Sequence, residues 1–347
     1  MIHLKQIYMK KHYQHILGID VSKKTLDLSL VIDRDKQNVV YEQFENNAKS
    51  IRRIGLWLKK YNIEWDRVLV CMEFTGIYNR PMLQFCTLKK IAVWMIMPIE
   101  IIRSMGIQRG KNDKIDSKKI AMYAILHHDK IKVWQPVSKN IVLLKDLLAL
   151  RQRLIKVSKI LLQPINELKA IKDKVAAKET EVHCKSSIEQ LKKELHKTEA
   201  RIKKIITEDE VLQKNYNLLL TIPGIGAYTA LDLVCYTNNF EYYQEAKQLA
   251  CYAGTAPFEH SSGTSVRGKT RVSKMANQSL KTNLTLGAWS VIRTKGFLRK
   301  YYERKLDEGK AKMLVVNAVR NKLLHIASAV IRNQMPFDRN YSSPLAS

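Results

Sequence analysis

The sequence predicts a three-part α/β plus α protein. We expect a three-layer α/β domain over residues 1–140, a coiled-coil region over 141–210 and a mostly helical domain over 211–347. Short apolar runs alternate with helical spacing in the first part, which indicates strands and covering helices. From Ile141 the chain is charged, helically periodic and free of glycine until Gly224. A length of 347 residues also exceeds what one ordinary core accommodates.

The first part has a recognisable order of elements. Three closely spaced strands, 16–21, 25–32 and 39–44, predict an antiparallel meander. After them we expect a helix over 48–61, a buried strand over 68–72, a helix over 81–89, a strand over 91–97, and two more helices, the second over 113–126.

Heptad spacing characterises the central part. Apolar residues recur at alternating intervals of four and three residues, and Pro164 occupies one position of this pattern. The apolar positions are Leu143, Leu147, Leu150, Leu154, Val157, Leu161 and Leu168. A second seam runs from Ile188 to Ile205. We expect two long helices separated near residues 176–184, with a kink or break at Pro164. They form either an antiparallel hairpin or a dimerising coiled coil, and the alternative is two ordinary helices packed on a core.

Charge indicates the partner. Sixty Lys and Arg residues against 32 Asp and Glu leave a net charge of +28. Such an excess attracts polyanions, of which nucleic acid is the commonest. An anionic membrane is the competing polyanion, but there is no run of 18 apolar residues and no apolar signal segment. The other alternative is a solvated surface whose charge only aids solubility. Five scattered cysteines without a CxxC pair fit apolar fillers in a reducing cytoplasm.

Four acids occupy positions that metal chemistry uses. Asp20 and Glu73 each close a predicted strand, and Asp113 and Asp116 lie three residues apart at a helix start. Carboxylates that converge repel one another unless a cation pairs with them. A pair of Mg²⁺ ions suits such oxygen ligands and phosphoryl displacement. Taken singly, each acid is better explained as a surface charge or a helix cap.

A serine precedes glycine in the last part. The segment 254–263 reads GTAPFEHSSG, which predicts a flexible polar loop with Ser262 exposed. His260 is a weak candidate for a local base. A basic stripe follows at Arg267, Lys269, Arg271 and Lys274 and is a candidate for nucleic-acid binding. On these residues alone, a plain Ser/Gly turn with solvated charges is the better explanation.

These segments together resemble one family. GIDVSK at 18–23, EFTGIY at 73–78 and KNDKID at 111–116 look like the three ordered motifs of the DEDD transposases of the insertion-sequence one-ten family. The resemblance implies a RuvC-like domain of ribonuclease H fold in which Asp20, Glu73, Asp113 and Asp116 hold Mg²⁺. The segment 254–263 resembles the family's second block, although GTAP departs from its usual GLxP. By that resemblance Ser262 is the nucleophile that forms a phosphoserine with DNA, and Ser261 is the alternative register.

The resemblance also implies function and partners. We expect a bacterial, cytoplasmic transposase that acts on double-stranded DNA, is guided by a structured bridge RNA, and works as a dimer pairing into a tetramer with composite sites. Two alternative functions remain. One is a RuvC-like nuclease that uses water as its nucleophile, and the other is a non-catalytic scaffold for nucleic acid. TIPGIG at 221–226 predicts either a phosphate-holding helix-hairpin-helix turn or a plain connection. Segment 106–111 is too short for a Walker A, which agrees with a reaction that needs no ATP.

Overall fold

The computed structural model describes residues 13–104, 112–243, 245–262 and 266–338, and for residues 259–270 it describes no side chains. Residue contacts divide the chain into two compact units, Met1–Pro136 and Val137–Ser347. The finer division into three domains stays a prediction, and the segment compared with a Walker A lies outside the described residues.

A five-stranded mixed sheet forms the centre of the first unit. Its order is β3-β2-β1-β4-β5, with β1 (His15–Val21), β2 (Thr25–Val31), β3 (Val39–Glu45), β4 (Val68–Glu73) and β5 (Ala92–Ile96). The pairs β1–β2 and β2–β3 are antiparallel, as predicted for the meander, whereas β1–β4 and β4–β5 are parallel. This order and these directions fit the ribonuclease H arrangement that the resemblance implies.

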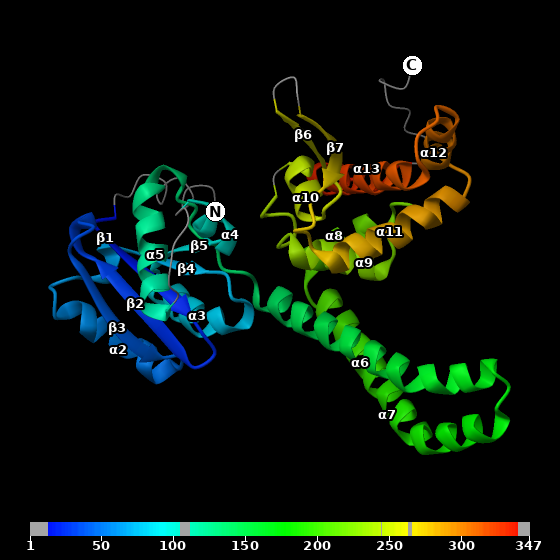
Figure 1. The fold of residues 1–347 in the computed structure, drawn as a ribbon, viewed down its shortest axis with the longest axis horizontal. Coiled ribbons are helices and arrows are strands. Elements are labelled where there is room, and N and C mark those ends of the chain that lie inside the picture. Colours follow the sequence, from blue (N-terminus) through cyan, green and yellow to red (C-terminus); the bar gives the residue numbers. More distant parts are fainter. Residues whose placement is uncertain (1–12, 105–111, 244, 263–265, 339–347) are drawn as a thin grey trace. The chain divides into compact units, whose positions relative to one another are not determined.

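Helices cover both faces of the sheet, which gives the predicted three layers (Figure 1). One core lies against α2 (Ala48–Lys59) and α3 (Arg80–Lys89) and includes Leu17, Ile19 and Val70. The other lies against α4 (Pro98–Ser104) and α5 (Asp113–Leu126) and includes Ile16, Leu69 and Cys71. Short 3₁₀ segments occur at Ile32–Arg34, Trp65–Arg67, Gly76–Asn79 and His128–Lys130.

The second unit begins with a long helical hairpin of α6 (Lys139–Ala170) and α7 (Lys174–Thr207). Ion pairs Lys169–Glu181 and Arg151–Glu199 join the two helices in antiparallel register. The predicted separation near residues 176–184 is wrong, because α7 runs through that segment. The turn lies at 171–173, where Lys172 has a φ of +63° and the Asp173 side chain caps α7 by accepting a hydrogen bond from the Ala176 amide.

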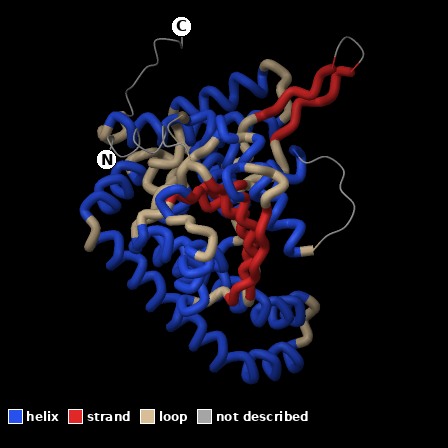
Figure 2. The backbone as a smooth tube through the Cα atoms, turned by 90° about the vertical axis from the view of Figure 1, so that its left-hand side faces the viewer, coloured by secondary structure: helices blue, strands red, loops and turns tan. Residues whose placement is uncertain are grey.

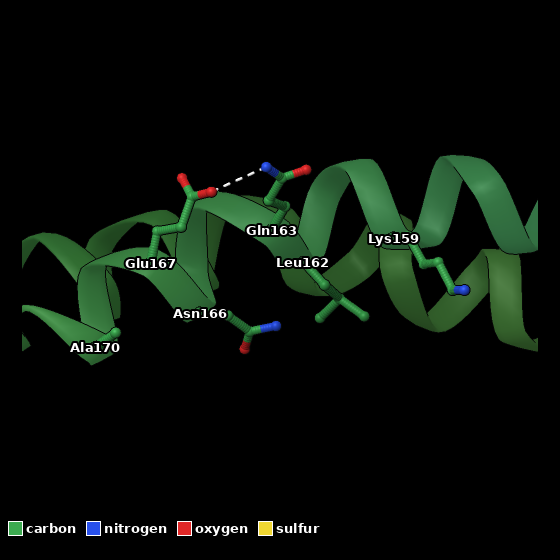
Figure 3. Close-up of a pocket in the computed structure, with 6 residues that line it drawn as sticks. All are labelled: Lys159, Leu162, Gln163, Asn166, Glu167 and Ala170. Atoms are coloured by element: carbon green, nitrogen blue, oxygen red, sulfur yellow. Dashed lines mark hydrogen bonds between the residues drawn. The ribbon is translucent and has the colours of Figure 1, made fainter. Parts of the chain in front are cut away.

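Pro164 lies inside α6, and the helix continues past it rather than breaking. A shallow hollow follows this stretch of α6, lined by Lys159, Leu162, Gln163, Asn166, Glu167 and Ala170 (Figure 3). Gln163 donates a hydrogen bond of 2.9 Å to Glu167 across its edge. The hollow contains none of the predicted site residues.

Shorter helices pack into the core of the second unit. They are α8 (Glu210–Leu220), α9 (Ala227–Tyr236), α10 (Ala246–Tyr252), α11 (Gln278–Arg293), α12 (Phe297–Asp307) and α13 (Lys312–Asn333). In the described part of the chain, α13 is the one helix long and apolar enough to cross a membrane, but half of that stretch is buried. Its contacts with α10, α11 and α12 make it a core helix of this unit.

A two-stranded antiparallel ribbon of β6 (Pro257–Ser262) and β7 (Val266–Val272) interrupts these helices (Figure 2). The prediction of a flexible loop over 254–263 is therefore wrong for residues 257–262. The sequence of residues 257–262 lacks the apolar alternation of a half-buried strand, so it gave no strand signal. Backbone hydrogen bonds nevertheless pair this segment with β7. The cysteine prediction is confirmed for Cys71, Cys86 and Cys235, which are buried and free, whereas Cys251 is exposed.

Candidate active site

Helix α5 lies directly against strands β1 and β2. A Cβ atom at Gly18 would lie 2.4 Å from the Ser117 carbonyl oxygen and 2.6 Å from the Ala121 amide nitrogen. Only glycine allows the helix backbone to approach β1 this closely. Beside this contact the hydroxyls of Ser29 and Ser117 form a buried hydrogen bond of 2.8 Å. The position of α5 over the sheet is thus fixed by backbone contact and one polar pair.

The strand register brings two of the predicted acids to one end of this covered face. Side chains alternate along a strand, so Gly18 and Asp20 share a face on β1, as do Cys71 and Glu73 on β4. Gly18 pairs with Cys71, so Asp20 and Glu73 each follow by two residues on neighbouring parallel strands. Both carboxylates therefore lie at the carboxyl-terminal edge of the sheet, on the side of α5.

The turn after β4 fixes the second motif. The Asn79 side chain donates 2.9 Å to the Glu73 carbonyl oxygen and accepts from the Thr75 amide at 2.7 Å. Gly76 has a φ of +76°, a conformation that favours glycine. These contacts explain the residues that follow Glu73 in the motif and hold the end of the strand.

The remaining two acids occupy the first turn of α5. Asn112 caps the helix by accepting a hydrogen bond of 2.8 Å from the Ile115 amide. Asp113 is exposed, whereas Asp116 is half-buried and forms an ion pair of 2.8 Å with Lys119. The positive end of the helix dipole favours carboxylates in this turn. The helix start therefore holds both acids over the edge where Asp20 lies.

Asp113 and Asp116 lie near enough to Asp20 for their charges to act on it. The pKa of Asp20 is raised to about 6, chiefly by burial and then by the charges of Asp113, Asp116 and Asp27, in that order. Hydrogen bonding to the Val21 amide opposes these effects. Because like charges act on Asp20 from α5 and from β2, the site favours a group that brings positive charge.

Asp27 is the carboxylate that sequence reasoning missed. It is 1% exposed and lies opposite Asp20 in the β1–β2 pair. The alternation of residues 25–31 (TLDLSLV) places this acid on the face that α5 covers. That alternation was the available signal, but a polar strand face is ordinarily read as solvent-facing.

The donor set suits a hard divalent cation, because it consists of carboxylate oxygens whose mutual repulsion a cation relieves. With the side chains as they stand, no three acids within the described residues lie close enough to hold an ion. Lys119 supplies the positive charge at Asp116 instead. The four carboxylates thus fit a divalent ion by their chemistry, and that all four share one ion stays a prediction.

The predicted nucleophile lies on the ribbon of the second unit. Ser262 ends β6 and pairs with Val266, and Ser261 pairs with Arg267. Arg267 and Lys269 belong to β7, but their side chains, like those of His260 and both serines, lie outside the description. The side chains of Arg271 and Lys274 are exposed.

The base of the ribbon is attached to α13. Thr255 is buried, and its carbonyl oxygen accepts a hydrogen bond of 2.8 Å from Asn317. The Thr255 hydroxyl lies 3.3 Å from the Asn321 side-chain oxygen. Gly254 has a φ of +64°, and a Cβ atom there would lie 2.4 Å from that of Ala276. The segment that departs from the family's GLxP pattern is therefore a packed anchor.

The turn at 221–226 connects α8 to α9. Gly224 has a φ of +88°, and a Cβ atom there would meet the Gly287 carbonyl oxygen of α11 at 2.8 Å. Close packing therefore accounts for this glycine. Whether the turn also holds a phosphate stays a prediction.

Comparisons with known proteins agree on the class. A family model described as a transposase of the DEDD, IS110 type matches residues 17–171. A second, described as the transposase IS116/IS110/IS902 family, matches residues 216–303. Between them they contain the four acids and Ser262. The chain is therefore a transposase, a DNA-recombining enzyme.

Sequence relatives narrow the class of transposase to which the chain belongs. Pilin gene-inverting protein of Moraxella bovis is 28% identical over 340 residues, which cover 95% of this chain and 99% of that protein, and the Moraxella lacunata protein of the same name matches equally. The insertion element IS110 43.6 kDa protein of Streptomyces coelicolor is 29% identical over 33% of this chain and 28% of its own length. The chain belongs to the IS110 family of transposases, as its motifs predict.

One solved structure resembles part of the chain. Thermus thermophilus RuvC in complex with a Holliday junction substrate covers 35% of this chain and 99% of its own, with 14% identity and a TM-score of 0.25.

Proposed function

We propose that this transposase excises and inserts a mobile element by cutting and rejoining double-stranded DNA through a phosphoserine intermediate. Asp20, Glu73, Asp113 and Asp116 would hold one or two Mg²⁺ ions, which supply a positive charge for the phosphate and its leaving oxygen. The observation that carries this proposal is the placement of acids at the α5-covered edge of the sheet, where burial, and then the charges of carboxylates on α5 and β2, raise the pKa of Asp20 to about 6.

Ser262 is the proposed nucleophile. Its hydroxyl oxygen forms a bond to phosphorus, the bond from phosphorus to a deoxyribose oxygen breaks, and that oxygen leaves with a proton. A second strand's hydroxyl then reverses the exchange and frees the serine. Because one phosphate ester replaces another at each step, the energy of the DNA backbone is retained and no ATP is consumed. Arg271 on β7 and Lys274 just after it are exposed, and we infer that both would bind nearby phosphates.

The proposed partners follow from charge and family. A net charge of +28 suits simultaneous binding of DNA and a structured bridge RNA that selects the target. A bacterial cytoplasm is the expected compartment. The Moraxella relatives are named for inverting a pilin gene. Inversion and insertion use the same cutting and rejoining, with the DNA sites arranged differently.

A homodimer formed through the helical hairpin is the proposed building block of a tetramer. Part of the apolar seam on α6 is exposed to solvent in the single chain: Leu143, Leu150 and Val157 are 39%, 41% and 43% exposed. Their seven-residue spacing forms a continuous stripe that a second helix could cover. Pairing of copies would also bring two sets of acids and serines to one synapsis, as joining two DNAs requires.

Trapping of the covalent intermediate tests the chemistry. Radiolabelled double-stranded DNA spanning the element's junction is incubated with the full-length chain, Mg²⁺ and RNA transcribed from the non-coding flank of the element. We expect a denaturation-resistant protein–DNA adduct from the wild type and from Ser261→Ala, and none from Ser262→Ala or Asp113→Asn.

The alternative functions give different patterns. A water-using nuclease would cleave DNA without any adduct, and Ser262→Ala would leave its cleavage unchanged. A non-catalytic scaffold would bind DNA and RNA equally well after Asp113→Asn and Mg²⁺ removal. Either pattern would overturn the phosphoserine mechanism. A structured non-coding segment beside the reading frame would in turn support RNA guidance.

A further inference from the structure

The Asp27 carboxyl group is buried, and among the residues that the structure describes it has no ion-pair partner. The residue is 1% exposed, and no Lys, Arg or His in the described part of the chain forms an ion pair with it. An isolated carboxylate in such a place is costly unless hydrogen bonds or a cation compensate for it. Its retention inside the first unit therefore calls for an explanation.

Two neutral donors hold one oxygen of this carboxylate. The Tyr41 hydroxyl donates to Asp27 Oδ1 at 2.5 Å, and the Gln43 side-chain amide donates to the same oxygen at 2.9 Å. Both residues belong to β3, where Gln43 pairs directly with Asp27. Burial, the hydrogen bond to Asp27 and the nearby charges of Asp27 and Asp113 raise the pKa of Tyr41 to about 12, so the hydroxyl keeps its proton.

The other side of Asp27 faces the acids. Strand β2 lies between β3 and β1, so the two donors reach Asp27 from one side while Asp20 lies opposite it on the other. Directly paired residues of antiparallel strands have their Cβ atoms about 4.5–5.5 Å apart on the same face. Both of these hydrogen bonds go to Oδ1, and the charge of Asp27 acts on Asp20 across the β1–β2 pair.

We propose that Asp27 is a fifth carboxylate of the metal site, a positioning residue that strengthens cation binding at Asp20 from the outer shell. This inference rests on the proposed function, because it assumes that the four acids hold a divalent ion. Mg²⁺ keeps several of its waters in proteins, and carboxylates beyond the direct ligands accept hydrogen bonds from such waters. Asp27 is held rigidly for this task by Tyr41 and Gln43, as outer-shell groups must be.

Calorimetric titration of the full-length chain with Mn²⁺ alone tests the proposal. Asp27→Asn has the same shape, keeps an oxygen for Tyr41 and Gln43, and removes the charge. We expect it to weaken Mn²⁺ binding by about 10–100-fold, the usual effect of losing an outer-shell partner. Tyr41→Phe keeps the charge and loosens its orientation, so we expect a smaller loss. Asp66→Asn, an exposed acid of the same unit, serves as the matched control.

The outcomes separate this inference from the proposed function. If the wild-type chain binds no Mn²⁺, or Asp20→Asn binds it equally well, the metal site itself is refuted. If Asp20→Asn abolishes binding but Asp27→Asn matches the wild type, the metal site stands and the role of Asp27 is refuted. A change in melting temperature without a change in Mn²⁺ affinity would make Asp27 a structural anchor of β2 and β3, which also refutes the proposal.

Discussion

Asp20→Asn should make the first unit more stable at neutral pH while it destroys recombination. The folded chain raises the pKa of Asp20 from 3.8 to about 6, chiefly through burial and then through the charges of Asp113 and Asp116. Each pKa unit corresponds to about 1.4 kcal/mol, so the full shift would cost about 3 kcal/mol. Since Asp20 is only partly buried, we expect asparagine to recover about 1–3 kcal/mol.

The sign of the pH dependence follows from linkage. Well below pH 3.8 the carboxyl group is protonated in both states, so aspartate and asparagine should differ little. Between pH 4 and 6 the folded chain binds its proton more tightly than the unfolded chain, so wild-type stability falls relative to the variant as pH rises. Above pH 6 the full difference should be present. Divalent cations should shrink this difference by favouring the charged carboxylate of the wild type.

Urea unfolding followed by tryptophan fluorescence measures this effect. Four of the five tryptophans belong to the first unit, so the signal reports mainly on it: Trp57, Trp65, Trp94 and Trp134. The titration is run in EDTA at pH 4 and pH 7.5, with Asp66→Asn as an exposed control. Equal stability of Asp20→Asn and wild type at pH 7.5, or a less stable variant, would contradict the convergence of acids on Asp20.

Two further predictions concern packing. Gly18→Ala places a Cβ atom 2.4 Å from the Ser117 carbonyl oxygen, so α5 must move by roughly 1 Å. We expect the free energy of unfolding to fall by about 1–3 kcal/mol and the recombination rate to fall at least tenfold. Gly55→Ala, whose Cβ atom would meet only a Trp65 side-chain atom at 3.1 Å, is the control, and equal unfolding curves would refute the close contact. Val157→Asp should dissociate the proposed dimer in light scattering, whereas Val175→Asp, 83% exposed outside the seam, should not. A dimer that persists in Val157→Asp would place the interface elsewhere.

The first unit was predictable from sequence because its elements carry strong local signals. The helix over 113–126 has its predicted bounds, since Asn112 is a good cap and the apolar spacing ends at Leu126. The strands match within two residues because each is a short apolar or alternating run between polar turns. Gly18, in contrast, is explained only by the helix that packs against it.

The position of the hairpin turn and the role of Asp27 were not predictable. Heptad spacing persists across the turn at 171–173, which contains neither glycine nor proline, so Lys172 adopts its left-handed conformation without a sequence signal. Asp27 alternates with leucines as a solvent-facing residue would. Its burial depends on the long-range packing of α5 across β2, which no local pattern encodes.

The surroundings of the acids indicate where the proposed cation would bind most strongly. Asp116 has Lys119 as an ion-pair partner and shares the positive end of the α5 dipole with Asp113. Asp27 has two hydrogen-bond donors on β3. Asp20 lies between these groups, receives a hydrogen bond from the Val21 amide, and still has its pKa raised to about 6. The fold thus compensates the charges of Asp116 and Asp27 by its own contacts but leaves Asp20 short of positive charge. A Mg²⁺ ion would therefore be bound most strongly at Asp20.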